Sequence, residues 1–450
     1  MQPDAFINPT HNVHLRSWIE PANDPLSDFP VQNLPYCSVE LIGGVASAAV
    51  AIGDQVVILS ELHREGLLQA EPCSLASVDS IAKMPVDARS RLRAQLSRLF
   101  SDQSKELSGR PDIIAKSFVP LASAKLLLPC TISNYTDFYA SIHHASTVGA
   151  MFRPDNPLLP NYKHIPIGYH GRASTLVPHG TPIRRPAGQQ SPPDASPSDG
   201  PSFGPCKMLD HELEVGCIIA EGNNIGEPIA VGRAFANILG LCLVNDWSAR
   251  DMQKWEYQPL GPFLAKNFAT TLSPFIITTE ALAPFRCPLA DRPLTDPAPL
   301  PYLTSAQDLA FGGFDIVLEV YLLSQKMRDA SIAPHRISHG RGFKDMYWTF
   351  AQMIAHHTSN GCRLLPGDLL ASGTVSGEHP ESRGCMLELS WDGPGKPRKP
   401  ITLPTGETRT FLADGDIITF KGYCERAGFR RVGFGECSGL VLPSAPLPPA

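Results

Sequence analysis

Carboxylates inside an otherwise apolar run are the first residues in this sequence that could do chemistry. In the segment 207–220, Leu209, Leu213 and Val215 are apolar, and the even positions between 209 and 215 are acids: Asp210, Glu212 and Glu214. Because side chains along a strand alternate between its two faces, Glu212 and Glu214 would share one face. Asp246 follows the apolar run ILGLCLVN, where a charge needs either a partner or a function. A solvated sheet face is the simpler interpretation of the first stretch alone, but the additional acid favours a site.

Histidines are the natural candidates for a general base, because their pKa lies near neutral pH. We expect a helix from Thr136 to about Phe152, in which Asp137 and His144 are separated by about two turns and could face one cavity. A lone helical histidine more often has a surface or hydrogen-bonded core role. Other histidines are equally plausible as bases at this stage: His211, His356 and His357.

Cationic and hydrogen-bonding side chains follow Asp246 in the segment NDWSARDMQKWEYQPLGPFLAKNF, which contains Arg250, Gln253, Tyr257 and Lys266. Such a mixture suits the recognition of an oxyanion or a carboxylate. It is also compatible with an ordinary solvated helix and loop. Further acids lie in strand-like apolar runs, and spacing alone does not rank them: Asp315, Glu319 and Glu388.

The elements that position these residues are predicted from composition and periodicity. The chain has 450 residues, 43% hydrophobic, and its 44 prolines and 36 glycines favour turn-rich β structure over a helical bundle. Short apolar runs over 36–60 predict a small β-domain, followed by a helix over 84–100. We place the domain boundary near Pro129, which gives domains of residues 1–128 and 129–450. Helical periodicity returns over 344–358, and Pro-rich loops are expected over 189–205 and 284–302.

Overall charge and sequence signatures exclude several classes of function. The formal net charge is −6, so no basic surface for nucleic acid or an anionic membrane is indicated. No stretch is apolar enough to span a membrane, so a cytoplasmic protein is expected. The eleven cysteines form no CxxC pair, and we expect them to be reduced. GxxxxGK[ST], HExxH and GxSxG motifs are absent, which argues against a phosphate-binding loop, a zinc protease and a serine nucleophile.

At these residues the chain resembles the fumarylacetoacetate hydrolase family. The resemblance rests on long blocks: YTDFY, VGAMFR, PIGYHGRAST, ELE, NDWSARD, PLGPFLAK, LLASGT, MLELSW and VGFGECSG. It implies a mainly β (α+β) fold with a small SH3-like β-barrel at the amino end and a larger mixed β-roll domain. It also implies a homodimer, a small-molecule substrate, and hydrolysis of 4-fumarylacetoacetate to fumarate and acetoacetate, the last step of tyrosine and phenylalanine catabolism.

The resemblance further implies roles for individual residues. Ca²⁺ or Mg²⁺ would be held by Asp137, Glu212, Glu214 and Asp246, an all-oxygen set that suits a hard cation. His144 would be the general base, with Glu388 orienting its ring. The oxyanion would be stabilised by Arg250, Gln253 and Lys266. Substrate oxygens would be held by Tyr139, Arg153, Tyr169, Tyr257 and Thr374.

Two alternatives accompany this interpretation. An acylpyruvate hydrolase or oxo-acid decarboxylase of the same superfamily would share the metal-binding carboxylates but not the reaction. The extra amino-terminal domain and the extended NDWSARDMQKWEY block count against it. A non-catalytic relic that binds a metabolite is the other, and the presence of His144, Glu388 and all four presumed ligands argues against it.

Overall fold

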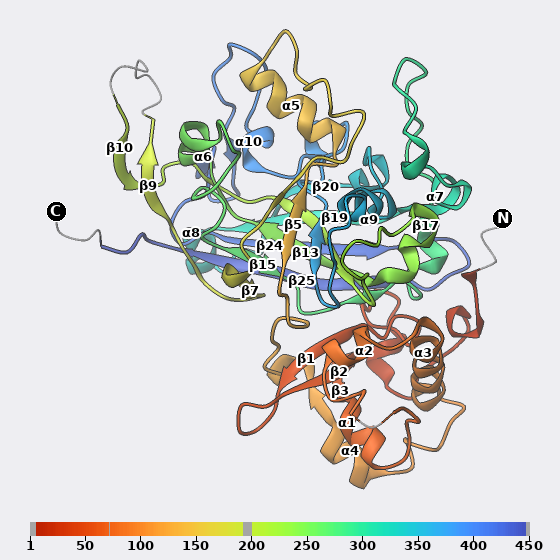
Figure 1. The fold of residues 1–450 in the computed structure, drawn as a ribbon. Coiled ribbons are helices and arrows are strands. Elements are labelled where there is room, and N and C mark those ends of the chain that lie inside the picture. Colours follow the sequence, from red (N-terminus) through yellow and green to blue (C-terminus); the bar gives the residue numbers. More distant parts are fainter. Residues whose placement is uncertain (1–5, 72, 192–199, 447–450) are drawn as a thin grey trace.

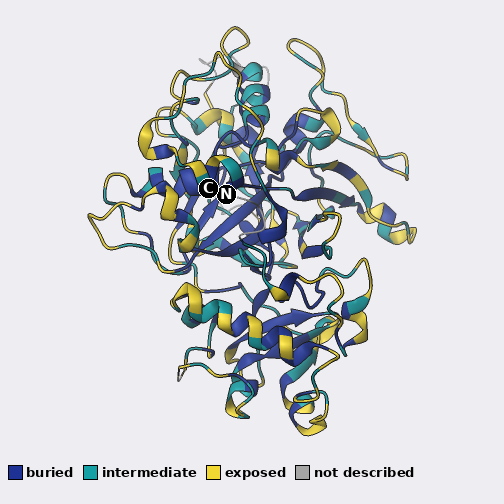
Figure 2. Ribbon diagram, turned by 90° about the vertical axis from the view of Figure 1, so that its right-hand side faces the viewer, coloured by how far each residue is buried: buried dark blue, intermediate teal, exposed yellow. Residues whose placement is uncertain are grey.

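The fold is described from a computed structural model that covers residues 6–71, 73–191 and 200–446. Figure 1 shows the chain up to about residue 130 as a lower lobe and the remainder as a larger upper lobe. In Figure 2 the central strands of both lobes are mainly buried, while exposed residues gather on helices and loops. Backbone hydrogen bonds join the two lobes, because the N–H groups of Tyr36 and Ile276 each donate to the carbonyl of the other residue.

The lower lobe is an antiparallel sheet with the strand order β1-β2-β3-β4. Its strands are β1 (Tyr36–Glu40), β2 (Ala46–Ile52), β3 (Gln55–Ile58) and β4 (Phe118–Pro120). Its helices are α1 (Leu59–Arg64), α2 (Val78–Ala82), α3 (Val86–Phe100) and α4 (Pro111–Ser117). The strands expected over 36–60 and the helix expected over 84–100 are therefore present, the helix beginning after Pro85. A closed SH3-like barrel is not confirmed.

The upper lobe is built around an eight-stranded sheet with the order β6-β5-β21-β12-β13-β15-β7, in which β16 also pairs with β13. The strands are β5 (Tyr135–Phe138), β6 (Gly168–His170), β7 (Leu176–Pro178), β12 (Leu213–Ile219), β13 (Ile238–Asp246), β15 (Thr270–Leu272), β16 (Ile277–Thr278) and β21 (Leu369–Ala371). Its central strand β12 is buried along its whole length. This explains why its sequence is apolar at nearly every position.

A hydrophobic core lies on each face of this sheet, and successive side chains along a strand point alternately into one core and the other. Along β12, Val215 and Cys217 belong to the core of the upper lobe. Ile218 belongs to a second core, which also contains many buried apolar residues of the lower lobe, such as Leu62 and Phe100. The lower lobe therefore packs against one face of the sheet. The proposed division into domains 1–128 and 129–450 stays a prediction.

A five-stranded sheet completes the upper lobe, with the order β20-β19-β24-β25-β8. Its strands are β8 (Ile183–Arg184), β19 (Val317–Leu323), β20 (His335–Gly340), β24 (Ile417–Cys424) and β25 (Val432–Leu442). Four pairs of short strands complete the described sheets: β9 (Ala187–Gln190) with β10 (Ser202–Pro205), β11 (Leu209–Asp210) with β14 (Ser248–Ala249), β17 (Arg286–Cys287) with β18 (Gly313–Phe314), and β22 (Ile401–Thr402) with β23 (Thr408–Arg409). The mainly β, mixed architecture that was expected is present.

The helices of the upper lobe are short and correct several expected boundaries. They are α5 (Ile142–Phe152), α6 (Arg250–Glu256), α7 (Ala306–Phe311), α8 (Gln325–Asp329), α9 (Phe350–Thr358) and α10 (Met386–Leu389). The helix expected over 344–358 begins only at Phe350, because Thr349 and Gln352 form a capping box there. The loop expected over 189–205 is partly strand, because it includes the end of β9 and all of β10, and its residues 192–199 lie outside the described residues. The loop expected over 284–302 contains β17 and a short 3₁₀ turn at Pro301–Leu303.

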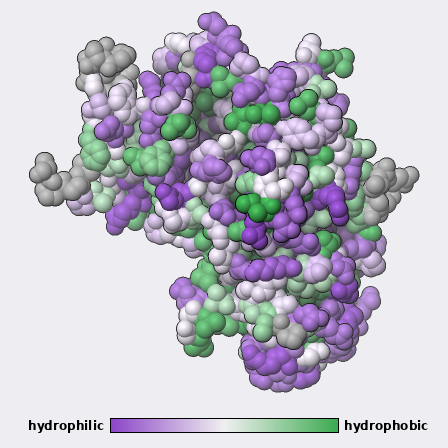
Figure 3. Space-filling model, in the orientation of Figure 1, coloured by the Kyte–Doolittle hydropathy of each residue, from purple (hydrophilic) through white to green (hydrophobic). Residues whose placement is uncertain are grey.

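Hydrophobic and hydrophilic residues are mixed over the surface shown in Figure 3. Among the most exposed apolar side chains of the described chain are Leu260 and Phe263, in the segment that follows α6. No described helix combines the length and the apolar character that crossing a membrane requires.

Candidate active site

Four buried carboxylates from separate parts of the chain lie together in the upper lobe. Oxygen atoms of Asp137, Glu212, Glu214 and Asp246 all fall within 4.8 Å of one another. None of the four residues is more than 5% exposed. The structure thus brings together the acids that the sequence suggested as metal ligands, and we call them the acidic cluster. Their role as ligands is taken up below as a proposal.

Strand pairing explains how the acidic cluster forms. Strand β21 lies between β5 and β12, parallel to β5 and antiparallel to β12, and its Ala371 is opposite both Asp137 and Gly216. Strand β13 then pairs with β12, with Glu214 opposite Val244. Because side chains alternate between the two faces along a strand, the acids of β5, β12 and β13 all point to the face that packs on the second core. Glu212 immediately precedes β12, and its carbonyl accepts a hydrogen bond from the N–H of Asp246.

The helix expected from Thr136 to Phe152 is wrong in its first part. Asp137 belongs to strand β5, and α5 begins only at Ile142. Ser141 ends the intervening turn and caps the helix, because its hydroxyl accepts a hydrogen bond from the N–H of His144 at 3.3 Å. Asp137 and His144 are therefore related by a strand, a turn and a first helical turn, rather than by two turns of one helix.

Several oxygens of the acidic cluster have no donor. Among the described residues, neither carboxylate oxygen of Glu214 has a hydrogen-bond partner, and the same holds for Oδ1 of Asp137. Burial, reinforced by the neighbouring carboxylates, raises the pKa of Asp137 and of Glu214 well above the ordinary range. Burial likewise raises the pKa of Asp246, although Lys266 opposes the shift. This arrangement concentrates negative charge that an additional cation would neutralise.

Two cationic side chains border the acidic cluster on the side of Glu212. Lys266 Nζ contacts Glu212 Oε2 and lies 2.7 Å from Asp246 Oδ2. Arg250 Nη1 lies 2.7 Å from Glu212 Oε1 and donates a hydrogen bond to Gln253 Oε1 at 3.0 Å. Burial alone would raise the pKa of Glu212, but Lys266 and Arg250 hold it well below the usual range. The three residues predicted to stabilise an oxyanion thus lie in one group beside the cluster.

His144 and Glu388 form a buried pair. The Nδ1 atom of His144 lies 2.6 Å from Glu388 Oε2, which also accepts a hydrogen bond from the Ser376 hydroxyl at 2.6 Å. Burial opposes ionisation of Glu388, yet His144 and Ser376 hold its pKa below the ordinary value. Because the carboxylate accepts the Nδ1 proton, Nε2 is the ring nitrogen left to accept another. The pair lies close to Arg250, because Asp210 Oδ2 accepts hydrogen bonds both from Arg250 Nε and from the N–H of Leu387, which precedes Glu388.

Glu388 was expected in a strand, and the structure places it elsewhere. It belongs to the short helix α10, whose first turn is held by hydrogen bonds to a side chain distant in sequence. The apolar pattern of MLELSW arises because that helix is buried, not because it alternates across a sheet. A short buried helix and a short buried strand have similar patterns of apolar residues.

The five residues expected to hold substrate lie in different settings. The Tyr139 ring packs edge-on against His144 with centroids 5.4 Å apart, and the Tyr169 hydroxyl donates to Asp246 Oδ2 at 3.2 Å. The Thr374 hydroxyl and Arg153 Nε are buried without a hydrogen-bond partner among the described residues. Tyr257 follows α6, and its N–H donates to the carbonyl of Gln253. Tyr139 thus contacts His144, and Tyr169 contacts the acidic cluster through Asp246.

Two polar residues of this region were not singled out as members of the site. Ser376 donates to Glu388, and Thr270 donates its hydroxyl proton to Asp246 Oδ1 at 2.9 Å. Serine and threonine are common in strands and loops, so neither carries a sequence signal. Only the folded arrangement identifies them.

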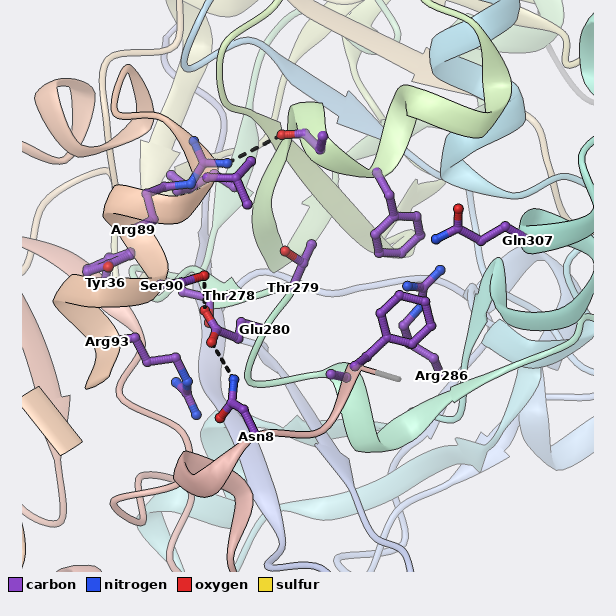
Figure 4. Close-up of a pocket in the computed structure, with 16 residues that line it drawn as sticks. Asn8, Tyr36, Arg89, Ser90, Arg93, Thr278, Thr279, Glu280, Arg286 and Gln307 are labelled. Carbon is purple, nitrogen blue, oxygen red and sulfur yellow. Dashed lines mark hydrogen bonds between the residues drawn. The ribbon is translucent and has the colours of Figure 1, made fainter. Parts of the chain in front are cut away.

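A cavity of about 330 Å³ lies where α3 meets the upper lobe, away from these residues. In Figure 4 Arg89, Ser90 and Arg93 lie on one side of this cavity and Arg286 on the other, with Glu280 hydrogen-bonded to Ser90. Glu280 accepts hydrogen bonds from Asn8 at 2.6 Å and from Ser90 at 3.1 Å, which links the two lobes. All the predicted site residues are described, and none of them lines this cavity.

Comparison with known families covers both lobes. Residues 32–129 match the family described as fumarylacetoacetase N-terminal, and residues 133–439 match the family described as fumarylacetoacetate (FAA) hydrolase C-terminal.

Individual relatives match along nearly the whole chain. The fumarylacetoacetase of Bos taurus is 46% identical over 435 residues, covering 95% of this chain and 99% of the relative. That of Homo sapiens gives the same identity and coverage. The fumarylacetoacetase of Arabidopsis thaliana is 44% identical over 440 residues, covering 96% and 99%. The matched residues therefore belong to both lobes.

Proposed function

The chain belongs to the fumarylacetoacetase family, and on this premise we propose that it hydrolyses 4-fumarylacetoacetate to fumarate and acetoacetate. The observation that carries the proposal is the buried His144 and Glu388 pair beside a cationic group and the acidic cluster. A base, an anion-stabilising group and a carboxylate cluster together suit hydrolysis of a β-diketone. In cells the reaction would complete the breakdown of tyrosine and phenylalanine.

The acidic cluster fits a hard divalent cation, Ca²⁺ or Mg²⁺. All four donors are carboxylates, and three of their buried oxygen atoms have no hydrogen-bond partner within the described chain. Asp137, Glu212, Glu214 and Asp246 would hold the ion. When bound, the cation would supply positive charge that polarises the substrate oxygens and orients the diketone.

The remaining chemistry belongs to the side chains of the chain itself. His144 Nε2 takes a proton from water, and the water oxygen attacks the carbonyl carbon on the fumaryl side. Glu388 keeps Nδ1 protonated and stabilises the imidazolium that forms. Arg250, Gln253 and Lys266 donate hydrogen bonds to the oxyanion. Collapse of this intermediate breaks the carbon–carbon bond and releases fumarate, and the acetoacetate carbon takes up a proton.

Substrate orientation is assigned to the second set of residues. Tyr139, Arg153, Tyr169, Tyr257 and Thr374 would hold the carboxylates and carbonyl oxygens of the substrate. The buried, unpartnered donors of Thr374 and Arg153 support this assignment, because a bound oxygen would satisfy them.

We also propose that two copies of the chain form a homodimer in the cytoplasm. Sedimentation would test the homodimer, and cell fractionation would test the location.

The test is turnover by the purified chain after removal of metal with a chelator. We expect hydrolysis of fumarylacetoacetate to disappear and to return when Ca²⁺ or Mg²⁺ is restored. Acylpyruvates and oxaloacetate serve as comparison substrates in the same assay. Faster turnover of either one would favour the related hydrolase or decarboxylase activity, and activity that survives complete metal removal would refute the role of the acidic cluster.

A further inference from the structure

Asp210 is a fully buried acid that the proposed mechanism does not use. It ends the two-residue strand β11, which pairs with β14 immediately before Arg250. Its carboxylate is 0% exposed, although it lies only two residues from Glu212. Its oxygens are not part of the acidic cluster, because donors from the next residue, from α6 and from α10 saturate them.

Both carboxylate oxygens of Asp210 hold the first turn of α10. Oδ1 accepts hydrogen bonds from the N–H groups of His211 at 2.8 Å and Met386 at 2.7 Å, and Oδ2 accepts one from Leu387 at 3.0 Å. Cys385 precedes α10 and provides no side-chain cap of its own. Asp210 therefore supplies the acceptors that this helix end requires. Glu388, the partner of His144, is the next residue along the helix.

The other function of Asp210 is to hold Arg250. Oδ2 accepts a hydrogen bond from Arg250 Nε at 2.9 Å. Arg250 Nη1 contacts Gln253 and Glu212, while Nη2 is buried with no partner among the described residues. Burial opposes the charged form, but Glu212 and Asp210 hold the pKa of Arg250 well above its ordinary value. The guanidinium is thereby held through Nε by Asp210 and through Nη1 by Glu212 and Gln253, and Nη2 is left for another acceptor.

We propose that Asp210 is a positioning residue that connects the oxyanion-stabilising arginine to the general-base pair. A single carboxylate sets both the orientation of Arg250 and the position of the turn that carries Glu388. The two groups must act together on one substrate carbonyl, so their common anchor fixes the distance between them. This inference rests on the function proposed above for Arg250, His144 and Glu388.

The test compares Asp210→Asn with a matched control, Asp416→Asn. An asparagine at 210 places an amide NH₂ group against at least one of the present donors, whichever way it is oriented. Asp416 is also 0% exposed and accepts hydrogen bonds from Arg409 and from the N–H of Ala413, but it lies outside the site. Both variants thus lose a buried carboxylate that is paired with an arginine.

We expect Asp210→Asn to lower kcat by about 10- to 100-fold with less than about a threefold change in KM, while Asp416→Asn keeps the kcat of the natural chain. In the Arg250→Gln background, the additional loss from Asp210→Asn should be smaller, because the two residues act partly through one another. Equal losses of kcat in the 210 and 416 variants would refute positioning. So would a kcat of Asp210→Asn within about twofold of the natural chain.

A measurement without substrate separates this inference from the proposed function. Amide hydrogen exchange at Met386 and Leu387 should accelerate in Asp210→Asn and stay unchanged in Asp416→Asn. Unchanged exchange in both variants would overturn the anchoring role, whatever the activity. A natural chain that is inactive on fumarylacetoacetate would contradict the proposed reaction instead, and accelerated exchange would still support the anchor.

Discussion

Two groups of buried carboxylates lie side by side in this molecule, and they differ in how their oxygens are satisfied. Both oxygens of Asp210 accept hydrogen bonds, from Arg250 and from peptide N–H groups. Oε2 of Glu388 accepts from His144 and Ser376, and its Oε1 lies 3.6 Å from Nη1 of Arg383. Glu214 and Asp137 have oxygens with no donor within the described residues. Equal burial therefore leads to opposite electrostatics: the pKa of Glu388 is lowered, while that of Glu214 is raised.

The difference indicates what each group needs. A carboxylate that accepts hydrogen bonds from its own chain is already stabilised as an anion, and it can orient another side chain. A group of carboxylates without donors remains electrostatically incomplete until a cation arrives from outside. Lys266 and Arg250 neutralise only the Glu212 and Asp246 side of the acidic cluster. The contrast thus distinguishes positioning acids from candidate metal ligands without reference to sequence similarity.

The largest effect is expected from removing the charge of Glu388, which accepts hydrogen bonds from its own chain. Glu388→Gln should lower kcat by about 10²- to 10⁴-fold with little change in KM, because the imidazolium of His144 loses its counter-charge. Steady-state kinetics on fumarylacetoacetate would measure this. Asp416→Asn serves as the control for loss of a buried carboxylate. A kcat within about threefold of the natural chain would show that the pair is structural.

Next in size is the response of the unsatisfied acids to metal. Ca²⁺ at a concentration about 100 times its Kd should raise the free energy of unfolding by about 2.7 kcal/mol. Glu214→Gln should lose most of this stabilisation, whereas Glu388→Gln should keep it. Denaturant unfolding with Ca²⁺ or with chelator would measure the difference. Equal stabilisation of both variants would place the cation elsewhere.

The same chemical change should have opposite effects on the metal-free protein. Glu214→Gln should raise the free energy of unfolding by about 1 to 2 kcal/mol, because it removes a repelled charge and adds a donor for its neighbours. Glu388→Gln should lower it by a similar amount, because an anion with existing donors is lost. Urea unfolding in chelator gives both values. Changes of the same sign would contradict the distinction between the two groups.

The smallest effect is a pH dependence. Because the pKa of Glu388 is lowered in the folded protein from its ordinary 4.5, its ionised form stabilises the fold above about pH 4.5. That contribution is lost as pH falls through the folded pKa, and each tenfold difference in proton affinity between the folded and unfolded chain amounts to about 1.4 kcal/mol. The difference in unfolding free energy between the natural chain and Glu388→Gln should therefore shrink below pH 4.5. A difference independent of pH would remove Glu388 as the cause.

The sequence predicted the acids better than the elements that carry them. Alternation along 209–215 and the acid at the end of an apolar run pointed to Glu214 and Asp246, and strand pairing does place them together. Asp137 and His144 were grouped through a helical spacing that does not exist, since β5 precedes α5. A β-strand followed by a capped helix can bring the same two residues near each other, and residue spacing does not distinguish the two cases.

Long-range contacts were beyond the reach of residue patterns. Glu388 lies 244 positions from His144, and the N–H of Leu387 lies 177 positions from the oxygen of Asp210 that accepts it. Nothing local to MLELSW or to KMLDHELEV announces either contact, because each depends on where distant segments pack. Strand order in the eight-stranded sheet was equally hidden, since β21 inserts between strands that precede it by a large part of the chain.

The insertion of β21 has a consequence for biosynthesis. Leu369 forms its pair with Tyr135 inside a sheet that already contains β12 and β13. A nascent polypeptide that has left the ribosome only as far as β13 has all four acids but lacks the strand that separates β5 from β12. Those acids can adopt their final spacing only late in translation, and so slow maturation governed by distant pairing is expected.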